Sequence, residues 1–153
     1  MKLFIVLSVF AVMSCQAQLP SRNALPASRP ADFRLSYHVD GGMRYYSESF
    51  AVTADSCVYD LVDEGRKTHQ VFKLSAAQLD QLYSLLRRNH FDEITAAVEG
   101  RVYDRGGISM RADWEKGQRQ IAVSDAQGSF VDKRWEADWS AICNYVAGLT
   151  RDK

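Results

Sequence analysis

The chain has 153 residues, and its 19 Lys and Arg balance its 19 Asp and Glu. This balance leaves no basic excess of the kind that recruits nucleic acid, so we expect no nucleic-acid partner. The 3 cysteines include no Cys-x-x-Cys pair, which argues against a thioredoxin-like redox role.

Residues 1–14 have the pattern of a secretory signal peptide. Lys2 is followed by an apolar run over residues 3–13 and then by the small residue Ser14. The run is shorter than the about 20 apolar residues that a helix needs to span a bilayer. We therefore expect the protein to be exported and residues 1–14 to be removed.

The segment Val12-Met13-Ser14-Cys15 resembles the lipobox of bacterial lipoproteins, although Met13 stands where Ser, Ala or Thr is commoner. The resemblance implies that Cys15 is lipidated, that cleavage occurs just before it, and that the new amino terminus is acylated. Each buried methylene contributes about 0.8 kcal/mol, so several acyl chains would anchor the protein lastingly in a membrane. Gln16, in place of Asp, resembles the class sorted to the outer membrane, facing the periplasm.

Another interpretation of the leader is cleavage after Ala17. That cut would release a soluble secreted protein that begins at Gln18 and acts as a ligand-binding protein or an inhibitor. The mature amino terminus distinguishes the two interpretations.

Residues 15–31 have the composition of a tether between this anchor and a folded domain. They hold all 3 prolines of the chain, at positions 20, 26 and 30, and few residues to bury. Such a tether would reach about 50 Å at most, from ~3.3 Å per residue. Residues 32–153 contain no proline and have the length of one globular domain.

Four strands are predicted at the start of this domain. Apolar and polar residues alternate with period two over residues 33–40 and again over 43–53, 57–61 and 68–74. Short turn signals, such as Gly41-Gly42 and Glu64-Gly65, separate these segments. Sequential strands with short turns favour an antiparallel meander.

A helix is predicted from Ser75 to about Asn89, because Ser75 and Gln78 form a capping-box pattern ahead of an apolar stripe. Residues 92–106 show no periodicity and are expected to form a long loop. Two further strands follow over residues 108–115 and 119–124. An amphipathic helix is predicted over residues 131–149.

Together these elements predict an α+β fold. We expect one antiparallel sheet in ββββ-α-ββ-α order with two helices packed on one face, because each element has a single apolar side. The layout resembles that of small Gram-negative lipoprotein domains of unknown function, a resemblance that implies no particular activity.

Cys57 and Cys143 both lie on predicted inward faces. The exported compartment permits a disulfide between them, and two buried free thiols would fit the same pattern. The histidines are scattered singly, and no catalytic or phosphate-binding motif is present. We therefore expect no metal, no cofactor and no enzymatic activity. An envelope hydrolase would instead require carboxylates such as Asp92, Glu93 and Asp104 to converge.

The polar face of the sheet is the candidate binding surface. Arg34 and His38 should share this face with Tyr45, and Arg111 should occupy the same side of the second hairpin. The residues Arg101, Tyr103 and Arg105 of the predicted loop form a second candidate. These side chains suit an envelope protein or a small anionic ligand, although an ordinary solvated sheet face and a polar loop would have the same composition. We therefore predict a membrane-tethered binding or scaffolding module.

Overall fold

The computed structural model describes residues 24–98, 102 and 104–151. The predicted signal peptide, Cys15, Arg101 and Tyr103 lie outside this described part. The elements are β1 (Arg34–Asp40), β2 (Tyr46–Val52), β3 (Cys57–Asp63), β4 (Arg66–Phe72), α1 (Ala76–Arg88), β5 (Ala96–Val98), β6 (Gly107–Trp114), β7 (Arg119–Asp125), β8 (Ser129–Val131), the 3-10 helix η1 (Lys133–Trp135) and α2 (Glu136–Arg151).

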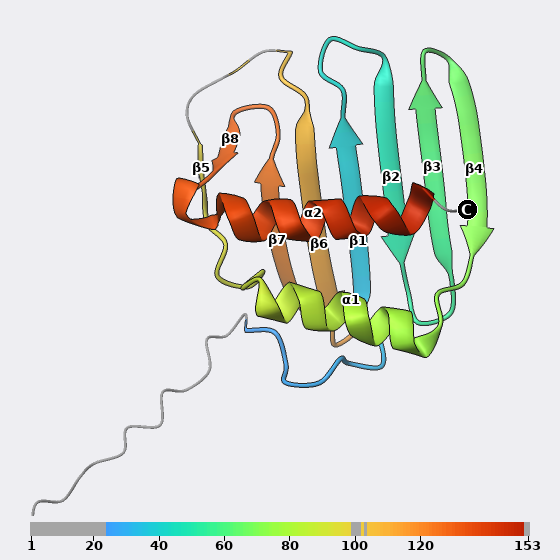
Figure 1. Ribbon diagram of the computed structural model, residues 1–153, viewed down its shortest axis with the longest axis vertical. Helices are drawn as coiled ribbons and strands as arrows, with labels where there is room; N and C mark the ends of the chain where they lie inside the picture. Colours follow the sequence, from blue (N-terminus) through green and yellow to red (C-terminus); the bar gives the residue numbers. More distant parts are fainter. Residues whose placement is uncertain (1–23, 99–101, 103, 152–153) are drawn as a thin grey trace, which may run out of the picture.

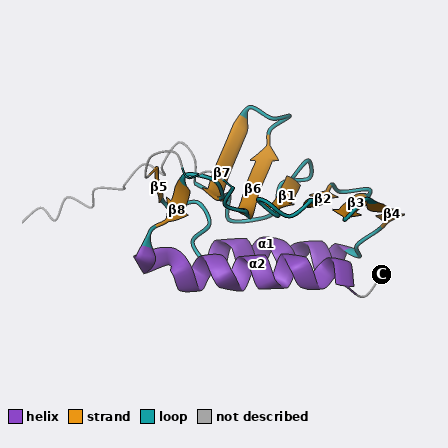
Figure 2. Ribbon diagram, turned by 90° about the horizontal axis from the view of Figure 1, so that it is seen from above, coloured by secondary structure: helices purple, strands orange, loops and turns teal. Residues whose placement is uncertain are grey.

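Six strands form one sheet in the order β4-β3-β2-β1-β6-β7, and every neighbouring pair is antiparallel. Both α helices lie across the same face of this sheet, as Figure 1 shows from the helix side and Figure 2 from above. The predicted α+β class is thus confirmed, with the two helices on one face. Among the described elements, no helix lies on the opposite face of the sheet.

Helix α1 begins where the capping pattern predicts. The backbone N–H of Gln78 donates to Ser75 Oγ at 3.2 Å, and the N–H of Ser75 donates to Gln78 Oε1 at 2.9 Å. These two bonds satisfy donors that the first helical turn otherwise leaves unpaired. The predicted apolar stripe is buried against the sheet; its members are Leu79, Leu82, Tyr83 and Leu86.

The core lies between the sheet and the helix layer. On β1, Leu35 and Tyr37 are buried whereas their neighbours are exposed, which is the alternation that a half-covered strand requires. Each large side chain that is fully buried contributes about 1.5–3 kcal/mol. Helix α2 covers the sheet with four buried apolar residues, namely Trp139, Ile142, Cys143 and Val146.

The segment predicted as a long loop contains a strand. β5 pairs antiparallel with β8, which ends at Val131, where the sequence predicts the last helix to begin. The backbone N–H of Asp132 donates to the carbonyl of Thr95 at 2.9 Å and extends this pairing. Strands this short show no period-two pattern, and α2 itself begins only at Glu136.

Residues 24–31, expected to belong to the tether, pack on the domain instead. We call this segment the N-terminal strap. Leu25 is buried, and its backbone N–H donates to Asp92 Oδ2 at 2.9 Å. The hydroxyl of Tyr83 on α1 donates to the carbonyl of Pro26 at 2.8 Å. The folded domain therefore includes residue 24, and only residues 15–23 remain for the predicted tether.

Candidate binding surface

The sheet face opposite the helices brings three of the predicted surface residues together. We call it the open face. Arg34 and His38 of β1 and Arg111 of β6 all alternate with buried neighbours and are exposed. In the sheet register, His38 lies between Ser49 and Ser109. The alternation predicted from the sequence therefore places these side chains on one surface, although they are far apart in the chain.

A shallow groove of about 260 Å³ crosses the open face over β1, β6 and β7. Most of its lining side chains are small, so they leave the space free. His38 and Arg111 are the two longer polar side chains, and both carry N–H donors. The residues that line the groove are Ser36, His38, Ser109, Met110, Arg111, Ala122, Val123 and Ser124.

Two arginines, Arg34 and Arg111, lie on the open face at this groove. Arg34 pairs in register with Asp113, and Arg111 Nε lies 3.9 Å from the carboxylate of the same Asp113. The Arg111 guanidinium thus lies near one carboxylate, and its side chain is 51% exposed. Such an arrangement favours a carboxylate or phosphate group on a ligand, because an exposed guanidinium can donate two parallel hydrogen bonds to it.

The same row of side chains continues to the far strand of the sheet. Asp60 of β3 lies beside Ser49, and His69 of β4 lies beside Asp60. His69 Nδ1 is 2.6 Å from Asp60 Oδ1, and both side chains are at least half exposed. The open face therefore presents a continuous polar row that ends at the edge strand β4.

Tyr45 does not line the groove. It precedes β2 in the turn after β1, and its side chain is 69% exposed. Its backbone carbonyl accepts a hydrogen bond from the N–H of Glu64 at 2.9 Å. Tyr45 is thus presented at one end of the sheet, apart from His38 and Arg111.

Arg105 is held by contacts within the protein. Its guanidinium donates to the carbonyl of Ser129 and to Asp125 Oδ1, both at 2.8 Å, and lies 4.1 Å from the centre of the Phe130 ring. These contacts fix the segment before β6 against β7 and β8. Arg105 is therefore a structural residue, which its place in the predicted loop did not indicate.

The two domain cysteines are buried, and neither is part of a disulfide in the structure. The disulfide that the sequence allows is not formed in the structure, which matches the alternative of two buried thiols. Burial, with a smaller contribution from Asp125, raises the pKa of Cys143 to about 12. A thiol with such a pKa is protonated at neutral pH and is a poor nucleophile.

The carboxylates that an envelope hydrolase would require do not converge. Asp92 accepts the backbone N–H of Leu25, and Glu93 lies 3.8 Å from His90 Nδ1. Asp104 lies at the other end of the sheet, where its backbone packs against Gly42 in the turn after β1. A side chain at Gly42 would meet the carbonyl oxygen of Asp104, and its φ of +63° also favours glycine.

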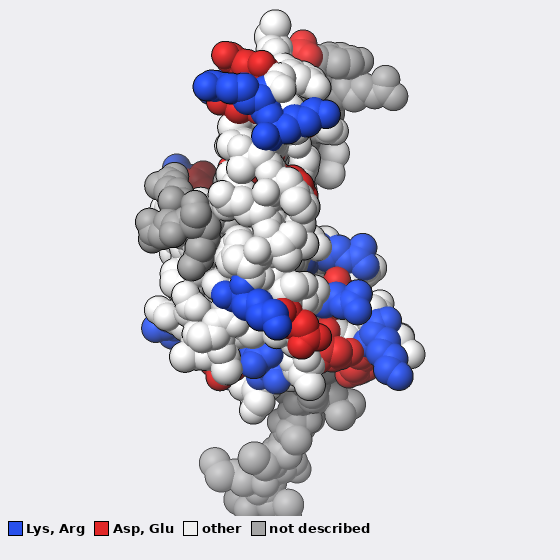
Figure 3. Space-filling view, turned by 90° about the vertical axis from the view of Figure 1, so that its right-hand side faces the viewer, with Lys and Arg blue, Asp and Glu red and all other residues white. Residues whose placement is uncertain are grey.

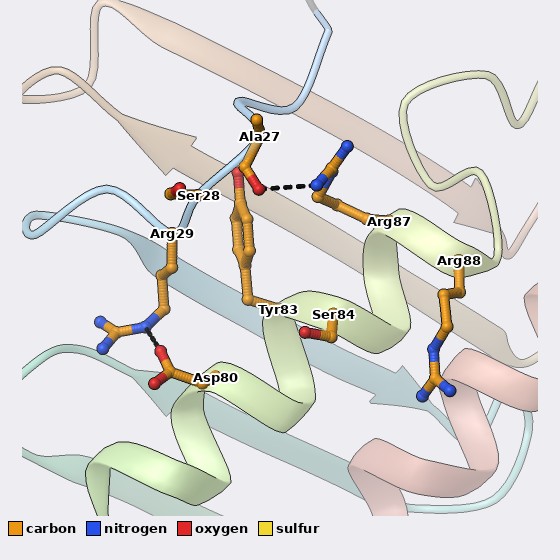
Figure 4. A pocket seen from close by; sticks show the side chains of 8 residues that line it. All are labelled: Ala27, Ser28, Arg29, Asp80, Tyr83, Ser84, Arg87 and Arg88. Atoms are coloured by element: carbon orange, nitrogen blue, oxygen red, sulfur yellow. Dashed lines mark hydrogen bonds and ion pairs between the residues drawn. The ribbon is translucent and has the colours of Figure 1, made fainter.

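A second hollow, of about 660 Å³, lies between the N-terminal strap and α1 (Figure 4). Arg87 Nη1 donates to the carbonyl of Ala27 at 2.6 Å, and Arg29 Nε donates to Asp80 Oδ1 at 2.8 Å. The guanidinium groups of Arg29, Arg87 and Arg88 point in different directions in Figure 4. Two of these arginines therefore hold the strap, and the three do not converge on a ligand.

No helix among the described residues is apolar over enough of its length to span a membrane. Within the same residues, no group of three or more His, Cys, Asp or Glu side chains is placed to hold a metal ion. In comparisons with protein-family models and with curated proteins, nothing matches this chain.

Proposed function

We propose that this protein is a lipid-anchored component of the bacterial cell envelope, and that its domain is a non-enzymatic binding module. The observation that carries the proposal is the leader, in which an export signal ends at Cys15 in a lipobox-like segment. Gln16 supports an outer-membrane anchor that faces the periplasm, because the residue after the lipidated cysteine carries sorting information in Gram-negative lipoproteins.

The shape of the domain supports a binding role. One face of the sheet is covered by helices, and the other face carries a groove with exposed N–H donors at His38 and Arg111. Arg34 adds a further positive charge on this face. An envelope protein that presents a carboxylate would suit these groups, because charge-assisted hydrogen bonds are stronger than neutral ones.

Substitution of Cys15 tests the anchor. In the native host, Cys15→Ser should move the protein from the membrane fraction to the soluble fraction or leave it uncleaved, since a serine has no thiol for the diacylglyceryl group. Cys143→Ala is the matched control, because this buried cysteine has no part in anchoring, and its fractionation should match the wild type. Unchanged fractionation and processing of Cys15→Ser would refute the lipoprotein assignment.

A further inference from the structure

β4 is one of the two edge strands of the six-stranded sheet. Strand β7, at the other end of the sheet, is in contact with β8. Figure 1 shows no element beyond β4, and Figure 3 views the molecule from this side. An edge strand presents backbone N–H and C=O groups that another extended chain can pair with.

The β3–β4 turn determines which backbone groups face outward. Glu64 and Gly65 have φ values of +50° and +86°, which is typical of a two-residue type I′ hairpin turn. In such a hairpin the flanking residues, Asp63 and Arg66, form a hydrogen-bonded pair. Hydrogen-bonded and non-hydrogen-bonded pairs alternate along the two strands. Lys67, His69 and Val71 belong to non-hydrogen-bonded pairs, so their backbone N–H and C=O groups point away from β3.

The side chains of this edge are basic at its two ends and uncharged between them. Arg66 and Lys67 lie at one end, where Arg66 Nη2 is 3.7 Å from Asp63 Oδ2, and Lys73 follows the other; the strand itself has no acidic residue. Figure 3 shows basic and acidic side chains together in an upper and a lower group, with a largely uncharged band between them. Between the basic residues of the strand, Val71 is 62% exposed. Proline, which often protects natural edge strands, is absent from β4.

The charges favour an acidic partner over a second copy of this chain. Antiparallel pairing of β4 with itself, through its outward backbone groups, would place Lys67 opposite either Val71 or Lys73 of the other copy. The first register gives these lysines no carboxylate, and the second sets like charges opposite each other, which is destabilising. An extended chain with carboxylates near its ends would instead pair with Lys67 and Lys73.

We propose that an extended, acidic segment of an envelope protein adds to β4 as a seventh strand. The proposal rests on the binding role of the module and names the chemistry of its partner. The outward groups of His69 and Val71 supply the main-chain hydrogen bonds, and the basic residues at the ends select for carboxylates. The open face continues onto this strand through Asp60 and His69, so one partner can contact both surfaces.

A synthetic peptide tests the proposal directly. The probe is a blocked peptide of alternating threonine and valine with glutamate at both ends, added to the purified mature protein in detergent. The backbone amide hydrogens of Lys67, His69 and Val71 should become protected from exchange, whereas those of Thr68 and Gln70 already bond to β3 and should change little. A matched peptide with lysine at both ends should bind several-fold more weakly.

Paired variants separate the backbone from the side chain. His69→Pro removes an outward N–H, a change that edge strands tolerate, and it should abolish protection by the peptide. His69→Ala keeps that N–H and should retain binding. If His69→Pro does not fold, the double change Lys67→Glu and Lys73→Glu supplies the test, because it should reverse the preference toward the lysine-ended peptide.

Three results would overturn the proposal. The first is that the edge amides stay unprotected at a saturating concentration of the glutamate-ended peptide. The second is that His69→Pro binds this peptide as tightly as the wild type does. The third is that the protein without peptide sediments as a dimer that forms through β4. None of these results depends on Cys15. Failure of the edge proposal is therefore distinguishable from failure of the anchor, which the fractionation of Cys15→Ser reports.

Discussion

At the scale of single residues, burial controls what the two domain cysteines can do. Cys57 is 1% exposed and Cys143 is 6% exposed, and the pKa of Cys143 is raised to about 12 by its loss of solvent. We expect neither thiol to react with iodoacetamide in the native protein at pH 8, and both to react in denaturant without reductant. Intact mass before and after treatment counts the modified thiols.

The same measurement distinguishes the alternatives for this pair. Rapid modification of the native protein would contradict the burial of the thiols. A failure to react in denaturant until a reductant is added would show that Cys57 and Cys143 form a disulfide in the exported protein, whereas the structure has none between them.

The raised pKa of Cys143 also predicts that the free energy of unfolding decreases at high pH. Between the ordinary thiol pKa of 9.0 and the value of about 12 in the folded protein, the folded state binds more protons than the unfolded state. The contribution of the Cys143 thiol to the free energy of unfolding is therefore fully present below pH 9 and is lost as the pH rises toward 12. The urea midpoint of Cys143→Ala should decline less over this interval than that of the wild type, and an equal decline would contradict the assignment.

Residue-level prediction from the sequence succeeds where the deciding pattern is local. The exposure of Arg34, His38 and Arg111 follows from strict alternation along β1 and β6. The role of Arg105 could not be predicted in this way, because its partners Asp125 and Ser129 come from elements that meet only in the folded chain. Local patterns report which face a residue occupies but not which distant group it contacts.

At the scale of elements, the N-terminal strap is the clearest addition to the predicted domain. Leu25→Ala should destabilise the protein by about 2–5 kcal/mol, because it removes a buried side chain and leaves a cavity. Met43→Ala is the control, since Met43 is 84% exposed and such changes usually stay within about 0.5 kcal/mol. Urea unfolding of the mature protein measures both. Equal free energies of unfolding for the two variants would show that the strap does not pack.

The elements predicted correctly are those whose sequence patterns extend over only a few neighbouring residues. The four-strand meander and α1 have turn residues, a capping box and regular periodicity. β5 and β8 are too short to show a period, and each depends on the other for its hydrogen bonds. The strap has one buried apolar residue, Leu25, whose hydrogen-bond partner Asp92 is distant in sequence.

At the scale of the whole molecule, the strap changes how the proposed anchor would hold the domain. Because residues 24–31 belong to the folded domain, a lipid at Cys15 would be separated from it by residues 15–23, at most about 30 Å from ~3.3 Å per residue. The chain enters the domain beside Asp92, just after α1, whereas β4 lies at the opposite side of the sheet (Figure 1). A lipid at Cys15 would thus hold the domain close to the membrane and leave the β4 edge away from the point of attachment.

The intact mass of the mature protein, purified from its native host without reductant, tests the central claim most directly. We predict a chain that begins at Cys15 and carries acyl groups, which would establish the tethered module and direct crosslinking toward envelope proteins. An unmodified chain that begins at Gln18 would contradict the lipid anchor and identify a soluble secreted protein.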